Sequence, residues 1–324
     1  MIVVNRKWVL MVLLLIIWAF VGSPGNPGAV YAKGIEYQKI SNKFYDFHFQ
    51  NAKEGWVCGN SGVLFKTEDG GLTWEKKESG TYSSIFGIHF TDGNHGVLVG
   101  EGGLVMTTSD GGKTWQAQET PVDKHLLTLD FYDARNGMAA GDWGKIIATN
   151  DGGQTWQDVS LEEDVVLYAV KFTGPEEVWI AGEMGTIFHT MDGGATWEKK
   201  EVGFATFFGI DMDGENNGFA VGLDGSVART TDGGANWDVT EITREALYNV
   251  LIGPDLVVTI GDAGTVLTLD LKNNNAWNLV DTPVELKANW LQAIAMVSDN
   301  RFILAGENGS IRFMENGRLL PAGQ

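Results

Sequence analysis

The chain has 324 residues, of which 44% are apolar and 11% are aromatic, enough to form one large hydrophobic core or two ordinary ones. It carries 42 acidic residues against 23 lysines and arginines, which gives a formal net charge of −19. A surface this acidic repels nucleic acid and anionic lipid headgroups, so neither is expected as a partner. The single cysteine, Cys58, excludes an internal disulfide and is predicted to be a small buried apolar residue.

The first 32 residues have the pattern of a secretory signal peptide. Arg6 and Lys7 precede an apolar run over residues 8–21, and a Gly/Pro-rich break then leads to small residues before Ala32. The run of about 14 residues is shorter than the roughly 20 that a membrane-spanning helix needs. We predict that residues 1–32 are cleaved, with an uncleaved membrane anchor as the alternative, and that residues 33–324 form one domain.

The chain then continues with short segments in which large apolar residues alternate with small or polar ones. Tyr45, Phe47 and Phe49 alternate with Asp46 and His48, and the same alternation recurs over residues 86–90 and 168–172. A period of two residues over a run of this length indicates β-strands, whereas no helical period occurs after the signal peptide.

A Gly-x-x-Gly turn recurs along the chain, with an apolar run before and after each occurrence. Each unit is therefore predicted to contain four short strands. The turns begin at seven glycines, namely Gly59, Gly100, Gly141, Gly182, Gly222, Gly261 and Gly306.

A second motif, TEDGGLTW at residues 67–74, recurs at intervals of about 41 residues, which is the period of a β-propeller blade. We predict that its Asp fixes the turn between strands three and four, that its glycines adopt positive φ, and that its Trp packs on the hairpin. These structural positions are Asp69, Asp110, Asp151, Asp192 and Asp232, with Trp74, Trp115, Trp156, Trp197 and Trp237.

Two ligand-binding interpretations of this box do not fit its residues. A phosphate-binding loop would open a helix, whereas a strand follows here. A calcium loop of the EF-hand type would need spaced carboxylates and a distal Glu, but each box has one central Asp. No metal site and no cofactor are predicted from these boxes.

The last unit lacks a Trp-bearing fourth strand, because residues 316–324 are short and contain Pro321. Residues 35–40 resemble the strand that follows the first box, so we predict that they supply the outer strand of the last blade and close the ring. The expected fold is all-β: a seven-bladed β-propeller of four-stranded antiparallel blades, closed by an N-terminal strand.

The boxes resemble Asp-box (BNR) repeats, which occur in sialidases, other glycan hydrolases and sorting receptors. The whole of residues 33–324, with Gly-x-x-Gly before each box, more closely resembles the photosystem II assembly/stability factor family. The resemblance implies an exported seven-bladed propeller that assists newly made membrane-complex subunits and has no catalytic activity and no cofactor.

The arginines depart from that resemblance, which implies an arginine cluster on one side of the propeller. The chain has few arginines after the signal peptide: Arg135, Arg229, Arg244, Arg301, Arg312 and Arg318. A relative from a non-photosynthetic bacterium, with a different client, fits at least as well as a photosynthetic one.

The partner-binding site is expected on the face that carries the Gly-x-x-Gly turns and the connections between blades. Acidic residues with interleaved aromatics there would suit a basic segment of a partner protein, although acidic turns could also serve only solubility. The predicted site residues are Glu101, Asp142, Trp143, Glu183, Asp224, Asp262 and Glu307, with Tyr168, Phe208 and Tyr248 near the channel mouth.

Polar residues of the inner strands are expected to approach the central channel. They are His48, His89, Asp130, Lys171 and Asp211, and the lysine among them favours an ion-pair network over a metal site. Carboxylates on one face could also form a glycosidase pair, but the arginine triad and the Tyr–Glu pair of sialidases have no counterpart.

We therefore expect a monomeric, non-catalytic, extracytoplasmic protein-binding platform that assists assembly or stability of a membrane or exported complex. Its compartment would be the periplasm, the thylakoid lumen in a photosynthetic host, or the medium. Membrane association would arise only through a partner or an uncleaved signal anchor. The alternative is a glycan-binding or sialidase-like, glycan-hydrolysing Asp-box propeller.

Overall fold

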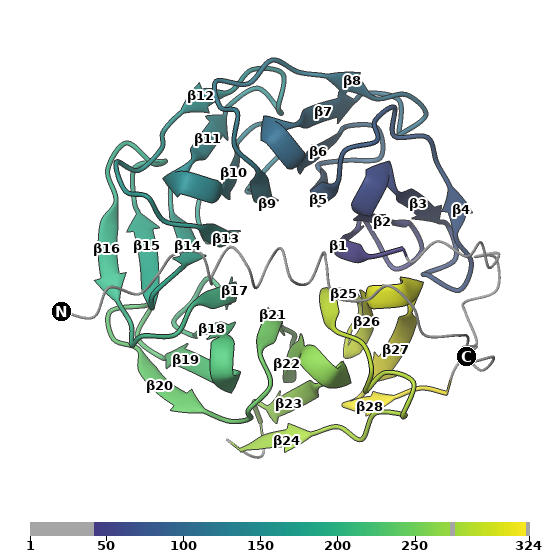
Figure 1. Ribbon diagram of the computed structural model, residues 1–324, viewed down its shortest axis with the longest axis vertical. Coiled ribbons are helices and arrows are strands. Elements are labelled where there is room, and N and C mark those ends of the chain that lie inside the picture. Colours follow the sequence, from purple (N-terminus) through teal and green to yellow (C-terminus); the bar gives the residue numbers. More distant parts are fainter. Residues whose placement is uncertain (1–41, 273–275, 322–324) are drawn as a thin grey trace.

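The computed structural model describes residues 42–272 and 276–321, which form seven four-stranded sheets arranged as blades in a ring (Figure 1). Neighbouring strands within every blade are antiparallel and follow one another in chain order. The prediction of an all-β, seven-bladed propeller is confirmed. The predicted signal peptide, residues 1–32, lies outside the described residues.

The first strand of each blade lies nearest the axis of the ring and the fourth lies at the rim (Figure 1). Blade 1 is built from β1 (Phe44–Phe49), β2 (Gly55–Gly59), β3 (Leu64–Thr67) and β4 (Glu75–Lys76). Blade 2 contains β5 (Ile85–Phe90), β6 (Gly96–Gly100), β7 (Val105–Thr108) and β8 (Gln116–Ala117). Blade 3 contains β9 (Leu126–Phe131), β10 (Gly137–Gly141), β11 (Ile146–Thr149) and β12 (Gln157–Asp158).

The remaining blades repeat this order. Blade 4 contains β13 (Leu167–Phe172), β14 (Val178–Gly182), β15 (Thr186–Thr190) and β16 (Glu198–Glu201). Blade 5 contains β17 (Phe207–Met212), β18 (Gly218–Gly222), β19 (Ser226–Thr230) and β20 (Asp238–Glu241). Blade 6 contains β21 (Leu247–Ile252), β22 (Leu256–Gly261), β23 (Val266–Asp270) and β24 (Trp277–Leu279). Blade 7 contains β25 (Leu291–Ser298), β26 (Arg301–Gly306), β27 (Ile311–Glu315) and β28 (Arg318–Leu319).

The hydrophobic core lies between blades rather than at the centre of the ring. The buried apolar residues form seven clusters, and each cluster joins two adjacent blades. In β2, for example, Trp56 and Cys58 pack toward blade 2 while Val57 packs toward blade 7. A second strand is covered on both faces, which explains why these strands are read as continuous apolar runs in the sequence.

Most Gly-x-x-Gly turns form short 3-10 helices, and no helix among the described residues is long and apolar enough to cross a membrane. The turns are η1 (Asn60–Gly62), η2 (Glu101–Gly103), η3 (Asp142–Gly144), η4 (Leu223–Gly225), η5 (Asp262–Gly264) and η6 (Glu307–Gly309).

The fourth strand of the last blade comes from the C-terminal end of the chain. β28 pairs with β27, with Met314 opposite Leu319. The prediction that residues 35–40 supply this fourth strand is therefore corrected, and those residues themselves lie outside the described part of the chain. Across the seam between the last blade and the first, the Gly309 N–H donates to the Asn42 carbonyl at 2.7 Å.

Candidate functional site

Backbone hydrogen bonds divide the loops between two faces. On the first face, the Gly-x-x-Gly turns contact the connections between blades, as when the Gly62 N–H donates to the Ser83 carbonyl at 2.9 Å. On the other face, the Asp boxes contact the turns between first and second strands, as when the Gly70 N–H donates to the Lys53 carbonyl at 2.8 Å. We call them the GxxG face and the Asp-box face.

The Asp boxes form a repeated turn held by side chains. In the first box, the Asp69 carboxylate accepts the Thr73 N–H at 2.8 Å and the Thr73 hydroxyl at 2.6 Å. The Thr67 hydroxyl donates to Asp69 and accepts the Gly71 N–H at 2.8 Å. Equivalent bonds occur in the other four boxes, where Asn236 replaces the second Thr in the last one. These carboxylates are occupied by turn donors.

The second glycine of each box also allows close contact with the preceding blade. A Cβ at Gly112 would lie 2.3 Å from Cη2 of Trp56, and one at Gly234 would lie 2.2 Å from Cη2 of Trp179. The box tryptophans pack at the same boundaries, since the ring of Trp115 meets that of Trp56 edge to face at 6.4 Å. The spacing within the box is repeated from blade to blade because the box joins neighbouring blades as well as strands.

The GxxG face carries most of the predicted carboxylates at one equivalent position. The first residue inside each turn donates its N–H to the carbonyl just before the inner strand of its own blade, for example Glu101 to Ser84 at 3.0 Å. Five of these first residues are acidic: Glu101, Asp142, Glu183, Asp262 and Glu307. The other two are Asn60 and Leu223, so the predicted Asp224 occupies the second position of its turn and is exposed.

Some of these side chains also fix the entry to their inner strand. Glu101 accepts the Ser84 N–H at 3.2 Å, and Glu183 accepts the Val166 N–H at 3.2 Å. Burial raises the pKa of Asp142 and of Asp262. Burial likewise raises the pKa of Glu307, and the negative charge of Asp262 raises it further. These three carboxylates are thus partly desolvated, and nearby cations oppose the shift: His125 and Lys124 at Asp142, and Lys43 at Glu307.

Aromatic side chains form two arcs around the channel mouth, next to these carboxylates. In one arc the ring centroid of Phe208 lies 4.9 Å from that of Tyr168 and 5.4 Å from that of Tyr248. In the other, Tyr45 stacks on Trp290 at 6.2 Å across the ring seam. The structure thus brings together the predicted Tyr168, Phe208 and Tyr248.

The pKa values of the tyrosine hydroxyls are raised by burial and by nearby negative charge. Burial raises the pKa of Tyr45 to about 12, with Cys58 and Glu101 adding to the shift. Burial also raises the pKa of Tyr168, and the charges of Glu183 and Asp142 raise it further. The mouth therefore combines apolar ring faces with partly desolvated carboxylates, which suits cationic and amphipathic groups.

The second position of the turns holds a feature that the sequence patterns did not reveal. Trp143 and Met184 adopt left-handed backbone conformations, with φ of 64° and 54°. A side chain with a Cβ is disfavoured there by about 1–2 kcal/mol. Both side chains are nevertheless large, apolar and exposed, at 53% and 64%. Phe204, in the connection after β16, is 99% exposed. Of these three residues, only Trp143 was among the predicted site residues.

The channel contains a chain of polar contacts that links inner strands. The rings of His48 and His89 lie 4.5 Å apart, and His89 Nδ1 lies 3.6 Å from the Asp130 carboxylate. Lys171 Nζ contacts Asp211 at 2.7 Å. Burial lowers the pKa of His48 to about 3 and that of His89 to about 4. Attraction by Asp211 raises the pKa of Lys171.

Three aspartates of this region also bond to the following blade. Asp46 accepts the Ile88 N–H at 3.0 Å, Asp130 accepts the Phe172 N–H at 3.0 Å, and Asp211 accepts the Ile252 N–H at 2.7 Å. Among the described residues, no cluster of three or more His, Cys, Asp or Glu side chains is suited to hold a metal ion. The geometry is that of an interblade hydrogen-bond and ion-pair network.

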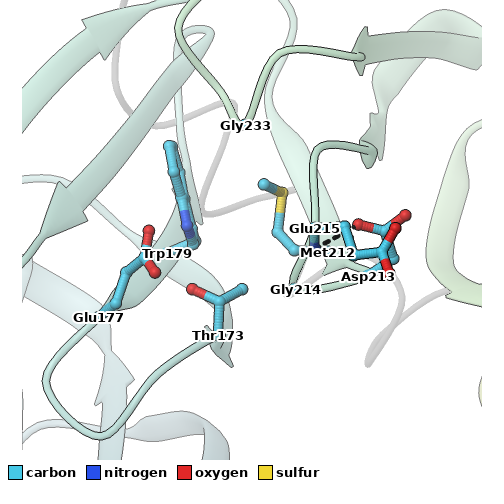
Figure 2. A pocket seen from close by; sticks show the side chains of 8 residues that line it. All are labelled: Thr173, Glu177, Trp179, Met212, Asp213, Gly214, Glu215 and Gly233. Atoms are coloured by element: carbon cyan, nitrogen blue, oxygen red, sulfur yellow. Dashed lines mark hydrogen bonds between the residues drawn. The ribbon is translucent and has the colours of Figure 1, made fainter.

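A small pocket lies between blades 4 and 5 on the Asp-box face (Figure 2). Thr173, Glu177 and Trp179 form one side, and Met212 and Asp213 lie opposite them (Figure 2). Its volume of about 30 Å³ accommodates one or two water molecules rather than a substrate. The Thr173 hydroxyl and the Trp179 Nε1 are buried without a hydrogen-bond partner among the described residues.

The family model described as photosynthesis system II assembly factor YCF48 matches residues 33–84, 78–125 and 114–204, which together span more than half of the chain. No curated protein matches.

Several solved propellers share the fold. A YCF48 bound to D1 peptide is 19% identical with a TM-score of 0.70, and the match covers 90% of this chain and 100% of that one. YCF48 from Cyanidioschyzon merolae is 16% identical with a TM-score of 0.69, covering 85% and 95%. The WD40 β-propeller domain of Doa1 is 11% identical with a TM-score of 0.69, covering 89% and 97%. At these identities the likenesses establish the fold alone.

Proposed function

Because the chain belongs to the YCF48 family of photosystem II assembly factors, we propose that it is a non-catalytic protein-binding platform that assists assembly or stability of a membrane or exported protein complex. In a photosynthetic host the client would be a photosystem II subunit, and in another host a different complex. The structure of a YCF48 with a bound D1 peptide supports a protein segment as the ligand.

The observation that carries the proposal is the composition of the channel mouth. Five carboxylates stand at equivalent turns of the GxxG face, and two arcs of aromatic rings lie beside them. Burial raises the pKa of Asp142, Asp262 and Glu307, so placing a partner's cation there relieves an existing electrostatic cost. Aromatic rings supply apolar contact area with little loss of side-chain entropy.

We also propose export of the chain by residues 1–32, which places the propeller outside the cytoplasm. Sequencing the N-terminus of the protein isolated from cells should give a start at Lys33. A start at Met1 in the membrane fraction would instead show an uncleaved anchor, and a start at Met1 in the cytoplasm would contradict export.

The function is tested by crosslinking residues 33–324 in cells and identifying the neighbours. We expect subunits of a membrane or exported complex. Reversing Asp142 and Glu307 to Lys should weaken their capture without lowering the melting temperature. Reversing Glu176 and Glu215 to Lys changes net charge equally on the Asp-box face and should leave capture intact. Recovery of polysaccharide alone, or turnover in a glycan-hydrolysis screen, would overturn the platform in favour of the glycan alternative.

A further inference from the structure

One sector of the GxxG face, at blade 4 and its connection to blade 5, concentrates exposed apolar surface. The connection wraps around the turn after β14: the Val202 N–H donates to the Gly185 carbonyl at 2.6 Å, and the Met184 N–H contacts the Thr206 hydroxyl at 3.5 Å. Phe204 lies between these two contacts, so its ring and the Met184 side chain project from adjacent backbone. We call Met184 and Phe204, together with Trp143 at the equivalent position of blade 3, the apolar sector.

The backbone shows that packing inside the molecule does not require these side chains. In the other turns, the position of Trp143 and Met184 is held by Ser61, Gly102, Asp224, Ala263 and Asn308. Small and Asn or Asp residues tolerate the left-handed conformation best. Blades 3 and 4 instead place large apolar residues there and leave them in solvent, as expected when strain is retained for a contact with a partner.

Two carboxylates flank the same sector, and Lys124 places its Nζ 5.9 Å from the ring centroid of Trp143. Asp142 precedes Trp143, and Glu183 precedes Met184, each at the first position of its turn. Both carboxylates lie close enough to Tyr168 to act on its hydroxyl. A partner that covers the apolar side chains therefore meets at least two carboxylates, and a lysine or arginine beside its apolar group would be attracted to them.

A groove extends from this sector down the rim of the ring. It has a volume of about 400 Å³ and runs from Gly203, next to Phe204, along β16 to Asn236 and Trp237 of the following Asp box. β16 is the outermost strand of its blade and pairs only with β15. A rim strand with one unpaired edge beside a groove suits an extended chain better than a helix.

We infer that the apolar sector is the anchor for an extended segment of the partner protein that carries a large apolar side chain next to lysine or arginine. This rests on the proposed function and specifies the partner that the platform accepts. The apolar side chains supply most of the affinity, as exposed aromatic and methionine anchors do at protein interfaces, and the carboxylates select against acidic segments.

The test in solution uses residues 33–324 and three short labelled peptides, in which Lys alternates with Leu, Glu with Leu, and Lys with Ser. We expect the Lys–Leu peptide to bind most tightly. The double variant Met184→Asn/Phe204→Ser should bind it roughly tenfold more weakly. Because Asn already occupies the equivalent position at residue 308, this variant should melt at the same temperature or higher.

The matched control is Tyr82→Ser, which removes an aromatic side chain that is 95% exposed, in the connection between blades 1 and 2. It should leave binding of the Lys–Leu peptide unchanged. Equal binding by the double variant, an equal loss in the control, or equal binding of the Glu–Leu peptide would each overturn the inference.

A photocrosslinking residue at position 204 or 82 separates this inference from the proposed function in cells. Capture of a complex subunit from position 204, through a segment with adjacent basic and apolar residues, supports the inference. Capture from position 82 but not from 204 would leave the platform function intact and overturn the anchor. Capture of no complex subunit from either position would contradict both.

Discussion

Gly234 and Trp179 fit together across the boundary between blades 4 and 5 so closely that no side chain can replace the glycine hydrogen. A Cβ on Gly234 would lie 2.2 Å from Cη2 of the indole, and Trp179 is only 1% exposed. Gly233, the neighbouring glycine of the same box, has nothing nearer than 3.7 Å around its Cβ position. Both glycines have positive φ, so substituting each of them separates the effect of the contact with Trp179 from the effect of the left-handed backbone.

Gly234→Ala is expected to lower the free energy of unfolding by about 3 kcal/mol, because it combines overpacking against Trp179 with a left-handed backbone. Gly233→Ala should lower it by about 1 kcal/mol, through the backbone alone. Urea unfolding followed by tryptophan fluorescence measures both. Adding Trp179→Phe to Gly234→Ala should recover part of the loss. Equal losses of unfolding free energy in the two variants would show that the contact between Gly234 and Trp179 does not limit the size of the side chain.

The Asp boxes predict a loss of stability in acid. Hydrogen bonds from Thr114 lower the pKa of Asp110 to about 2, and those from Asn236 lower the pKa of Asp232 to about 2. A carboxyl with a lowered folded-state pKa stabilises the protein above its unfolded value, about 3.9, and loses that contribution as the pH falls toward 2. Melting temperatures should therefore fall steeply between about pH 4 and 2. Asp110→Asn and Asp232→Asn should flatten this decline, and an unchanged slope would contradict the role of the boxes.

Asp46 should make the folding stability fall as the pH rises, which is the opposite of the effect of the Asp boxes. Burial raises its pKa to about 7, the charge of Asp130 adds to this, and N–H groups of Ile88 and Phe47 oppose it. The folded state then holds this proton more tightly than the unfolded state, so stability falls as the pH rises from about 4 through 7. Asp46→Asn removes the titration.

The gain in stability of Asp46→Asn over wild type should be larger at pH 8 than at pH 5, by about 1–2 kcal/mol since Asp46 keeps part of its surface in solvent. The nearby His48 and His89 titrate in both proteins, so most of their effect cancels in this difference. Chemical denaturation at the two pH values measures it. A gain that is equal at both pH values would contradict the raised pKa.

The small pocket between blades 4 and 5 predicts a stabilising substitution. At the boundary of blades 1 and 2, the side-chain amide of Gln50 donates to the Asp92 carbonyl at 2.8 Å. Thr173 holds the equivalent position in blade 4, and its buried hydroxyl has no partner among the described residues. Thr173→Gln should reach the Gly214 carbonyl and raise the free energy of unfolding by about 1 kcal/mol. The reverse change, Gln50→Thr, should lower the free energy of unfolding by a similar amount. A Thr173→Gln variant that is less stable than the wild type would contradict the expected hydrogen bond to Gly214.

The repeat could be predicted from the sequence because its strongest signals are local. Paired glycines and the Asp–Thr hydrogen bonds are satisfied within eight residues, and the seven Gly-x-x-Gly turns set the number of blades. The last strand could not be found in this way. β28 has only two residues and no Trp, and its pairing depends on β27 rather than on any turn motif.

The candidate site was predicted only where residue type was informative. Carboxylates and tyrosines at repeated positions indicated the mouth of the channel. Met184 and Phe204 look like ordinary core residues in sequence, but Met184 lies in a left-handed turn and Phe204 in the connection after β16, where both side chains are exposed. The GLDG turn itself places Leu223 at the first position, which carboxylates hold in the neighbouring blades, and Asp224 at the second, so the grouping of Asp224 with the other carboxylates overlooked a difference that the spacing already shows.

The ring closes at the seam between Gly309 and Asn42, where the last blade to be synthesised meets the first. The first blade can fold early, but Phe47 and Trp74 share their cluster with residues of the last blade, such as Ile303 and Phe313. At about 5–20 residues per second, roughly 12 to 50 seconds of synthesis separate the two sides of that cluster. The stacked pair of Tyr45 and Trp290 spans the same seam at the channel mouth. A chain cut short before its last blade therefore has no finished mouth, and a client that binds there can engage only full-length, closed rings.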